Sequence, residues 1–438
     1  MQQILLETDG ALSVQAAAQA IRSSLSGETF QGKRAALLIV PDYTRVHSNA
    51  GWIANQYYHL LEDSGIHVDL LEALGTHAPM TQAQCAAMYG DIPFSRFLAH
   101  DWRRDTVCIG HIPAAFIAEL SEGALETSVP VELNRRLFQP DYGLILSIGQ
   151  VVPHEVVGMS NQSKNLFVGC GGAQMIHASH MLGAVYGLER VMGRDFSPVR
   201  RMFDYAQAHF LSGLPVCYVL TVTAASGKRS AMHGLYIGRS RQVFEQAVAQ
   251  AQSRNLIFVE HPLKKAVVYL DSEEFTSTWL GNKAIYRTRM AMADGGELFI
   301  LAPGVRRFGE DAAMDALIRR YGYRGREEIL RLCRQESALQ ENLSAAAHLI
   351  HGSSDGRFSI TYCTCLLGRE EVENAGYRYL PFAQAASRFD FARFPDGMHT
   401  VCGEDVYFIS NPALGLWSTH ARFAENLLEK PVNKKEPV

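Results

Sequence analysis

The sequence lacks any excess of positive charge. Its 438 residues include 41 Lys and Arg against 45 Asp and Glu, which gives a formal net charge of −4. Proteins that bind nucleic acids draw much of their affinity from Lys and Arg side chains that neutralise phosphates. A chain with this balance has no general basic field to supply that attraction, so we expect no nucleic-acid partner.

Long apolar runs and targeting patterns are also missing. No window reaches the 18 or so uninterrupted apolar residues that a membrane-spanning helix requires. The N-terminus has no basic segment followed by an apolar stretch, which is the pattern of a secretory signal. We therefore expect a cytoplasmic protein with no membrane partner.

Cysteine is sparse and unpatterned. The eight cysteines are spread over the whole chain and form no CxxC pair, which argues against a disulfide-stapled secreted domain. Hydrophobic residues make up 47% and charged residues 20%, as in ordinary globular proteins. At this length one core usually gives way to two domains.

Apolar periodicity in the first half of the chain alternates between helix and strand. Helical spacing covers residues 11–25, 51–65, 81–90, 175–192 and 240–255, and short strand-like runs cover residues 33–40, 66–74, 141–149 and 215–223. Strands that alternate with helices predict a mainly parallel sheet. The fold class that we predict is α/β.

The pattern changes near residue 255. Strand-like runs at 256–271 and 297–303 alternate with helical segments at 282–294, 314–322 and 326–335. We predict two α/β domains, residues 1–255 and 256–438, with the mainly parallel sheet in the first domain.

Polar side chains follow three of the predicted strands directly. Asp42, Thr44 and Arg45 come after the first strand, His77 after the second and His154 after the third. The carboxyl ends of parallel strands form the crevice in which open α/β sheets bind ligands. One such cluster alone means little, since Asp42 could simply cap a helix, but three of them indicate a site at one sheet edge.

His77 and His154 are candidates for acid–base chemistry. Imidazole titrates near neutral pH, so two histidines on opposite sides of a hydroxyl can remove a proton and return it. Inversion of a carbinol carbon requires that pair of transfers. A lone histidine is more often structural.

The stretch 147–180 adds three further features. Lys164 precedes a glycine-rich turn with Gly171 and Gly172, and glycines before a helix let backbone N–H groups approach a phosphate. His177 and His180 are one helical turn apart, which suits metal ligation, although no carboxylate nearby completes a zinc site of ordinary spacing.

Taken in order, these residues resemble the catalytic subunit of lactate racemase and its nickel-pincer nucleotide family. The resemblance is carried by Asp42 with Thr44 and Arg45, Gly75-Thr76-His77, His154, Lys164 and His180. It is strongest over residues 38–182 and covers most of the chain. It implies an active site in the cleft between the two domains.

The resemblance also implies a cofactor and a role for each residue. Lys164 would tether a nickel-pincer nucleotide (nickel pyridinium bis-thiocarboxylate mononucleotide), and His180 would ligate its nickel. His77 and His154 would be the catalytic acid and base. Arg45 would hold the substrate carboxylate or polarise its oxygen. Further cofactor contacts would come from Asp42, Thr44, Gly171 and Gly172.

The reaction implied is that of an isomerase. A racemase or epimerase of this family inverts C2 of a 2-hydroxy acid by passing hydride to the cofactor, through a 2-keto acid, and back to the opposite face. Its partners would be the small-molecule substrate and the cofactor-synthesis enzymes. No pattern in the sequence sets an oligomeric state.

The substrate side departs from the lactate enzymes. Lys283 aligns with a substrate-site lysine, but Trp279 and Leu280 stand where the lactate enzymes carry tyrosine and glutamine. Arg306 and Arg307 would suit a larger polyhydroxylated acid. We therefore favour an aldonate over lactate as substrate, and Trp279 and Lys283 are candidate substrate-binding residues.

Three alternatives stay open on the sequence alone. The chain could racemise lactate or another short 2-hydroxy acid, or act as a zinc- or iron-dependent lyase or hydrolase through Asp42, His177 and His180. It could also be a non-catalytic carrier of the nucleotide.

Overall fold

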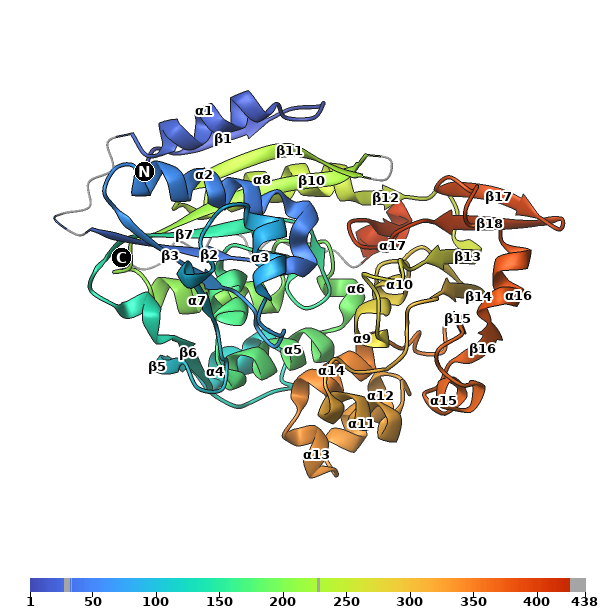
Figure 1. The fold of residues 1–438 in the computed structure, drawn as a ribbon. Coiled ribbons are helices and arrows are strands. Elements are labelled where there is room, and N and C mark those ends of the chain that lie inside the picture. Colours follow the sequence, from blue (N-terminus) through green and yellow to red (C-terminus); the bar gives the residue numbers. More distant parts are fainter. Residues whose placement is uncertain (27–31, 33, 227–228, 426–438) are drawn as a thin grey trace. The chain divides into compact units, whose positions relative to one another are not determined.

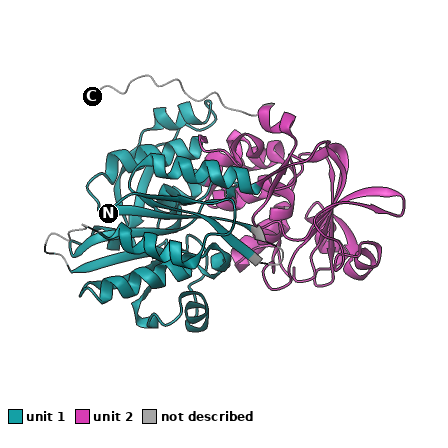
Figure 2. Ribbon diagram, turned by 90° about the horizontal axis from the view of Figure 1, so that it is seen from above, with its two compact units in different colours: residues 1–179, 198–255 teal, residues 180–197, 256–438 magenta. Residues whose placement is uncertain are grey.

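The computed structural model describes residues 1–26, 32, 34–226 and 229–425, so Lys33 of the first predicted strand lies outside the described residues. Contacts divide the chain into two compact units (Figure 2), Met1–Ser179 with Pro198–Asn255 and His180–Ser197 with Leu256–Val438. The division after Asn255 coincides with the expected domain boundary. Residues 180–197, which the sequence analysis placed in the first domain, cluster with the second unit instead.

The first unit contains a seven-stranded sheet of order β1-β11-β10-β7-β2-β3-β4 (Figure 1). Its strands are β1 (Ile4–Glu7), β2 (Ala35–Val40), β3 (His67–Glu72), β4 (Phe97–Ala99), β7 (Tyr142–Gln150), β10 (Val216–Ser226) and β11 (Arg229–Gly238). From β10 to β4 all neighbours are parallel, and only β11 and β1 add antiparallel pairs at one side. The predicted α/β class with a mainly parallel sheet is confirmed.

The central strands are buried on both faces, as parallel strands with helices on either side must be. Leu38 on β2 and Leu146 on β7 point into one core together with Ile53 of α2, and all three are fully buried. Helix α1 and α2 lie on one side of the sheet in Figure 1 and α7 lies on the other. The helices of this unit are α1 (Val14–Ser24), α2 (Ala50–Glu62), α3 (Gln82–Tyr89), α4 (Ala114–Leu120), α7 (Pro198–Phe210) and α8 (Arg241–Asn255).

Two small antiparallel pairs complete the first unit. They are β5 (Thr106–Ile112) with β6 (Val129–Asn134), and β8 (Pro153–His154) with β9 (Gly158–Met159). Helix α5 (Ala173–Tyr186) begins in the first unit and continues into the segment that belongs to the second. The sequence predicted one helix over 175–192. The structure ends it at Tyr186 because Gly187 has a φ of 106°, and the short α6 (Leu188–Val191) follows.

The second unit has a six-stranded sheet of order β16-β15-β14-β13-β18-β17. Its strands are β13 (Leu263–Tyr269), β14 (Met292–Leu301), β15 (Ser359–Thr364), β16 (Arg378–Pro381), β17 (Gly397–Val401) and β18 (Glu404–Ile409), with β12 (Leu256–Phe258) and β19 (Leu416–Ser418) paired separately. The helices are α9 (Thr278–Gly281), α10 (Lys283–Tyr286), α11 (Ala312–Tyr321), α12 (Arg326–Cys333), α13 (Ser337–Gln340), α14 (Leu343–His351), α15 (Arg369–Asn374), α16 (Phe382–Arg388) and α17 (His420–Glu425).

The predicted helix over 282–294 was largely wrong. Only α10 forms there, and Met292 already begins β14, because the run that follows pairs in parallel with β13 and with β15. Pairing of Met292 with Leu263 and of residues 297–301 with both neighbouring strands fixes this run as a strand, and local helical spacing does not compete with it. Within the residues described, no helix combines the length and apolarity needed to cross a membrane.

Replacement of a central sheet residue tests this core. Leu146→Ala removes a fully buried side chain and should lower the free energy of unfolding by about 2–5 kcal/mol. Leu5→Ala, on the edge strand β1 and 43% exposed, should change it by less than about 0.5 kcal/mol. Urea unfolding followed by circular dichroism compares the two. Equal midpoints for both variants would contradict the assigned core.

Candidate functional site

The carboxyl ends of β2, β3 and β7 meet at one sheet edge, because the three strands are parallel neighbours in register. The polar segments that follow them are thereby gathered. Asp42 and Arg45 follow β2, His77 follows β3, and His154 follows β7 on the short β8–β9 hairpin. The topology thus brings the segments that follow these three strands, and the side chains on them, to the same edge of the sheet.

Asp42 is the buried centre of the first segment. Its side chain is 9% exposed and caps the 3₁₀ helix Tyr43–Ser48, where one carboxylate oxygen accepts from the backbone N–H of Thr44 at 2.9 Å and from its hydroxyl. Capping was the simple alternative for this residue. In the structure Asp42 does cap this helix, and the cap uses only one of its two carboxylate oxygens.

The other oxygen of Asp42 binds His77. Nδ1 of the imidazole lies 2.5 Å from Oδ2 of Asp42. A carboxylate can only accept, so Nδ1 carries the hydrogen and the neutral ring keeps its lone pair on Nε2. The His77 side chain is 32% exposed. This arrangement orients Nε2 of His77 as a base, as a carboxylate does in hydrolase triads.

The electrostatics of Asp42 favour the charged form. Burial by itself would raise the pKa of this carboxyl, but it is outweighed by four effects together: the charge of His77 in its protonated form, the hydrogen bond from His77, the charge of Arg45 and the hydrogen bond from Thr44. The pKa of Asp42 is therefore well below its usual value. Arg45 is half-buried beside it and donates through Nη1 to the hydroxyl and carbonyl oxygens of Thr44, at 3.4 and 3.5 Å.

His154 has the opposite hydrogen-bond arrangement. Its Nδ1 accepts from the backbone N–H of Val156 at 3.1 Å, so the neutral ring carries its hydrogen on Nε2. Glu155 lies 3.6 Å from the same nitrogen, and the His154 side chain is 13% exposed. The tight β8–β9 hairpin creates this contact because it turns the Val156 amide back toward the ring. In its neutral form His154 thus has an Nε2–H that can donate a hydrogen bond.

Lys164 follows a constrained loop. Asn161 and Gln162 both have left-handed backbone conformations, with φ of 70° and 53°, and Lys164 precedes a short π-helix, Asn165–Gly169. Burial, followed by the positive charge of Arg45, lowers the pKa of Lys164 to about 8, although Glu155 and Asp42 pull in the other direction. Part of the amine is therefore unprotonated near neutral pH.

A backbone contact joins this unit to the segment of His77. The N–H of Gly75 donates to the carbonyl of Gly169, at the end of the π-helix, at 2.9 Å. On the other side, Asn165 donates to the Ser147 hydroxyl of β7 at 3.2 Å. Lys164 is therefore held between the ends of β3 and β7, and the charges of Arg45, Asp42 and Glu155 all act on it.

The glycine turn is engaged within the protein. The N–H of Gly172 donates to the carbonyl of Glu132 at 3.1 Å, and the N–H of Gln174, in the first turn of α5, donates to the Glu132 carboxylate at 3.0 Å. A Cβ on Gly172 would lie 2.3 Å from that carboxylate. Gly171 accepts through its carbonyl from the buried His100 at 2.9 Å. These contacts favour a packing role, so phosphate binding by Gly171 and Gly172 stays a prediction.

The two histidines of α5 have different surroundings. His177 packs edge-on against Trp102 with ring centroids 6.0 Å apart, and burial together with the charge of Arg103 lowers its pKa. His180 begins the segment that belongs to the second unit, and its role as nickel ligand stays a prediction. Among the described residues, no three His, Cys, Asp or Glu side chains converge to hold a metal ion.

The predicted substrate residues belong to the second unit. Trp279 of α9 stacks on His348 with ring centroids 4.2 Å apart, and Nζ of Lys283 lies 5.4 Å from the ring centre of Phe275. Nε2 of His348 in turn lies 3.0 Å from the Tyr323 hydroxyl. Trp279 therefore has a fixed ring plane, which suits contact with a flat or apolar part of a ligand.

The sequence reading missed two residues that shape the site. Arg200 of α7 is fully buried and binds the loop before Lys164, and Glu132 of β6 caps α5. An arginine on an amphipathic helix and a glutamate on a strand are ordinary surface residues by pattern. Their roles depend on tertiary neighbours that no local signal reveals.

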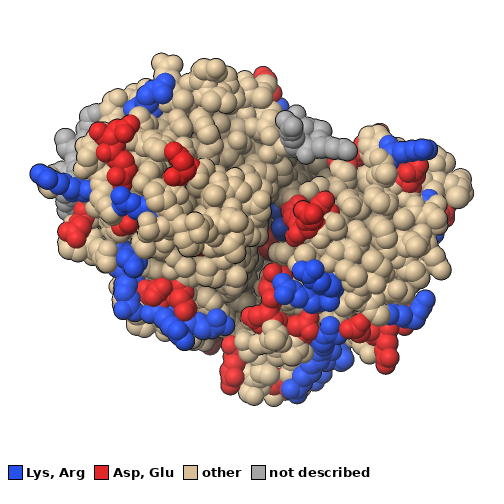
Figure 3. Space-filling model, viewed as in Figure 1, with Lys and Arg blue, Asp and Glu red and all other residues tan. Residues whose placement is uncertain are grey.

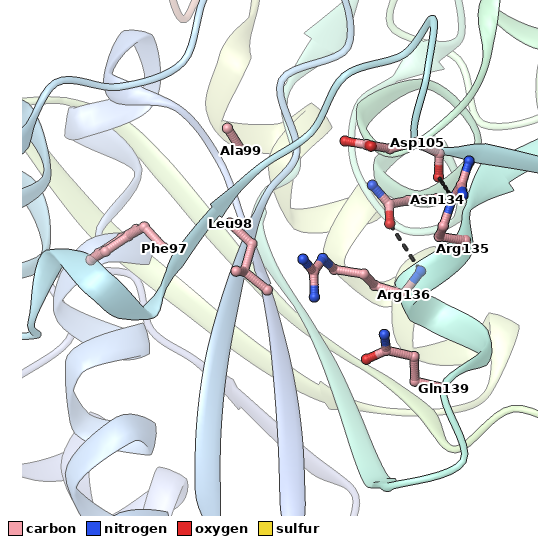
Figure 4. A pocket seen from close by; sticks show the side chains of 8 residues that line it. All are labelled: Phe97, Leu98, Ala99, Asp105, Asn134, Arg135, Arg136 and Gln139. Carbon is pink, nitrogen blue, oxygen red and sulfur yellow. Dashed lines mark hydrogen bonds between the residues drawn. The ribbon is translucent and has the colours of Figure 1, made fainter.

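A cavity of about 360 Å³ lies elsewhere in the first unit, beside the edge strand β4 (Figure 4). Its lining comprises Phe97, Leu98, Ala99, Asp105, Asn134, Arg135, Arg136 and Gln139. The predicted site residues are not part of this lining. Asn134 accepts from the backbone N–H of Arg136 at 3.0 Å and also donates to His100, so this wall is braced from within.

Charged side chains of both signs lie beside one another on the face of the molecule drawn in Figure 3.

Comparison with known proteins decides the family of the first part of the chain. Residues 2–190 match the model of the lactate racemase N-terminal domain. This stretch is thus similar to that domain. The resemblance stated from the separated site residues is confirmed for it, and Asp42, His77, His154 and Lys164 all lie inside the matched residues.

Two solved structures share the fold of nearly the whole chain. A structural genomics target from Thermotoga maritima is 23% identical with a TM-score of 0.81, over 94% of this chain and 100% of that one. The lactate racemase apoprotein from Thermoanaerobacterium thermosaccharolyticum is 15% identical with a TM-score of 0.68, over 95% of each chain. No curated protein matches the chain.

The Asp42–His77 pair predicts a pH dependence of stability. The pKa of Asp42 is lower in the folded than in the unfolded protein, so its contribution is complete above the unfolded value, about 3.9, and is lost as the pH falls through the folded value. The Asp42→Asn variant should therefore have a lower free energy of unfolding than the wild type at pH 7, and this difference in free energy should become smaller below about pH 4. Urea unfolding between pH 7 and 3 measures it, and a gap that widens toward low pH would contradict the assignment.

Proposed function

We propose that the chain is a racemase or epimerase that inverts C2 of a 2-hydroxy acid. The observation that carries the proposal is the opposite arrangement of the two imidazoles. His77 presents a lone pair on Nε2 because Asp42 takes its Nδ1–H, whereas His154 presents an Nε2–H because Val156 occupies its Nδ1. The family of residues 2–190 supports a hydroxy-acid racemase, and hence an isomerase.

The reaction needs a proton acceptor and a proton donor in the same site. Oxidation of a carbinol removes the hydroxyl proton and the C2 hydrogen with its electron pair, which leaves a 2-keto acid. Reduction from the other face then requires a proton for the carbonyl oxygen. A neutral imidazole as the base and a protonated imidazole as the acid can perform the two transfers, and each turnover leaves them in the states that the reverse direction needs. We assign His77 as the base and His154 as the acid, and the hydrogen-bond geometry supports this assignment.

The residues fit a cofactor that brings its own metal donors. Within the part of the chain that the structure describes, no three His, Cys, Asp or Glu side chains converge to hold a metal ion, which is compatible with a cofactor that carries metal donors of its own. When bound, a nickel-pincer nucleotide would supply sulfur donors to the nickel and accept and return the hydride. Lys164, with a pKa of about 8, offers a primary amine for its covalent attachment, and His180 would supply an imidazole ligand.

On the substrate side, Arg45 is placed to bind a carboxylate. Its guanidinium sits beside Asp42 and Thr44, and a planar fork of donors matches a carboxylate in two-point contact. We extend the proposal to a polyhydroxylated acid such as an aldonate, with Trp279 and Lys283 as contacts. The broad, fixed indole of Trp279 supports a longer substrate than lactate.

The attachment of the cofactor can be tested by mass spectrometry. We expect protein co-expressed with cofactor-synthesis enzymes to contain nickel and to carry a mass increment on the peptide with Lys164, and Lys164→Ala to lose the increment. Lys264, exposed in the second unit, provides the control as Lys264→Ala, which should keep it. The absence of both nickel and increment from the wild type would refute the cofactor claim.

The two histidines predict a shared loss of activity. With cofactor-loaded protein, His77→Gln and His154→Gln should each lower kcat by about 10²- to 10⁴-fold in both directions, because every turnover uses both groups. His59→Gln, on α2 with a 44% exposed side chain, should be near wild type. A hydroxy-acid panel that includes lactate and aldonates, incubated in deuterated water, identifies the substrate. Extensive deuterium at C2 would contradict hydride transfer and indicate enolisation.

A further inference from the structure

A fully buried arginine holds the loop that leads to Lys164. Arg200 of α7 is 0% exposed. Its Nη1 donates to the side-chain oxygen of Gln162 at 3.1 Å and to the hydroxyl of Ser163 at 2.8 Å. Its Nη2 donates to the backbone carbonyls of Met159 at 2.7 Å and Asn161 at 3.1 Å. One guanidinium thus binds nearly every residue of the loop Met159–Ser163.

The loop needs such a clamp because its backbone is strained. Asn161 and Gln162 are consecutive non-glycine residues with positive φ, a conformation that such residues keep only where their surroundings fix it. Arg200 binds the carbonyl of Asn161 and the side chain of Gln162, so it stabilises both strained residues directly.

The amide of Gln162 is fixed at both ends. Its oxygen accepts from Arg200 and from the Ser163 hydroxyl at 2.9 Å, and its nitrogen donates to Gln207 at 3.3 Å. Gln207 also accepts from the Tyr218 hydroxyl at 2.8 Å. The loop is therefore tied to α7 and to β10, and rotation of the backbone at Lys164 would break several bonds together.

We propose that Arg200 is a positioning residue for Lys164, which holds the loop Met159–Ser163 in the conformation that presents the lysine amine for covalent attachment. The inference rests on the proposed function, because attachment is what gives this amine its role. Arg200 touches neither substrate nor reacting atoms in this scheme. It acts through the loop and through its charge.

The charge of Arg200 also favours attachment at Lys164, because it lowers the pKa of the lysine amine. The groups that act on the Lys164 amine are Arg45 and Arg200, which lower its pKa after burial has done so, and Glu155 and Asp42, which raise it. Removal of Arg200 deletes one of the two cations that lower the pKa of Lys164. The pKa of Lys164 should therefore rise, which reduces the unprotonated fraction near neutral pH.

The test reads Lys164 directly in the full-length protein without cofactor. Pulses of acetic anhydride between pH 6.5 and 10.5, followed by peptide mass spectrometry, give the acetylation rate of Lys164 relative to Lys264. We expect the wild-type profile to rise with a midpoint near pH 8, and Arg200→Met to move the midpoint upward and slow acetylation at pH 7.5 by about threefold or more. Arg200→Lys, which keeps the charge but has fewer donors, should give an intermediate profile.

Two further variants separate positioning from general destabilisation. Leu235→Ala creates a cavity in the β11 core of the same unit and should leave the Lys164 profile unchanged. Ser163→Ala removes one acceptor of Arg200 but keeps its charge, and should speed amide hydrogen exchange over residues 161–165 by about threefold or more, which keeps the test available if Arg200→Met does not fold.

A wild-type Lys164 profile in Arg200→Met, an equal shift in Leu235→Ala, or unchanged exchange in Ser163→Ala would overturn the inference. None of these measurements uses substrate, nickel or the nucleotide. Failure of the cofactor to attach would therefore count against the proposed function, while failure of the Arg200 variants to alter Lys164 would count against this inference alone.

Discussion

The buried carboxylate of Asp42 is the contact on which the site depends. It closes the turn after β2 by capping the 3₁₀ helix that carries Arg45, and it binds the histidine that follows β3. A carboxylate with two pairs of acceptor sites can perform both tasks, whereas a neutral cap such as serine could perform only the first. Burial disfavours its charge, and that charge persists because His77, Thr44 and Arg45 all stabilise it. The ends of two neighbouring strands are thus fixed relative to each other by one side chain.

Much of this was predictable from the sequence because it depends on local pattern. The alternating periodicities predicted β2, β3, β7 and β10 with the helices between them, and parallel strands in succession place their following residues at one edge. The ordered spacing of Asp42, His77, His154 and Lys164 then indicated a family that the match over residues 2–190 confirms.

What could not be predicted depends on contacts between distant segments. Arg200 and Glu132 have no local signature, since each acquires its role by meeting a loop far away in sequence. β11 was missed because it completes the sheet only by pairing with β10 and β1. Residues 292–294 were assigned to a helix because the start of β14 is set by a distant contact, the pairing of Met292 with Leu263 of β13. Tertiary pairing overrides weak local preference in both cases.

The charged groups of the site help to explain why the pKa values of Asp42 and Lys164 are both below their usual values. The pKa of the buried Asp42 carboxyl is lowered, so Asp42 stays negatively charged. The pKa of Lys164 is also lowered, even though the negative charges of Asp42 and Glu155 act on it in the opposite direction. Arg45 contributes to both, because a cation that cannot release its proton stabilises a neighbouring carboxylate and disfavours a neighbouring ammonium. Arg200 is a second permanent cation that lowers the pKa of Lys164. Burial is the largest cause of the lowered pKa of Lys164, and the charges of Arg45 and Arg200 add to it. The two arginines thereby oppose the two carboxylates, Glu155 and Asp42, which favour the ammonium form.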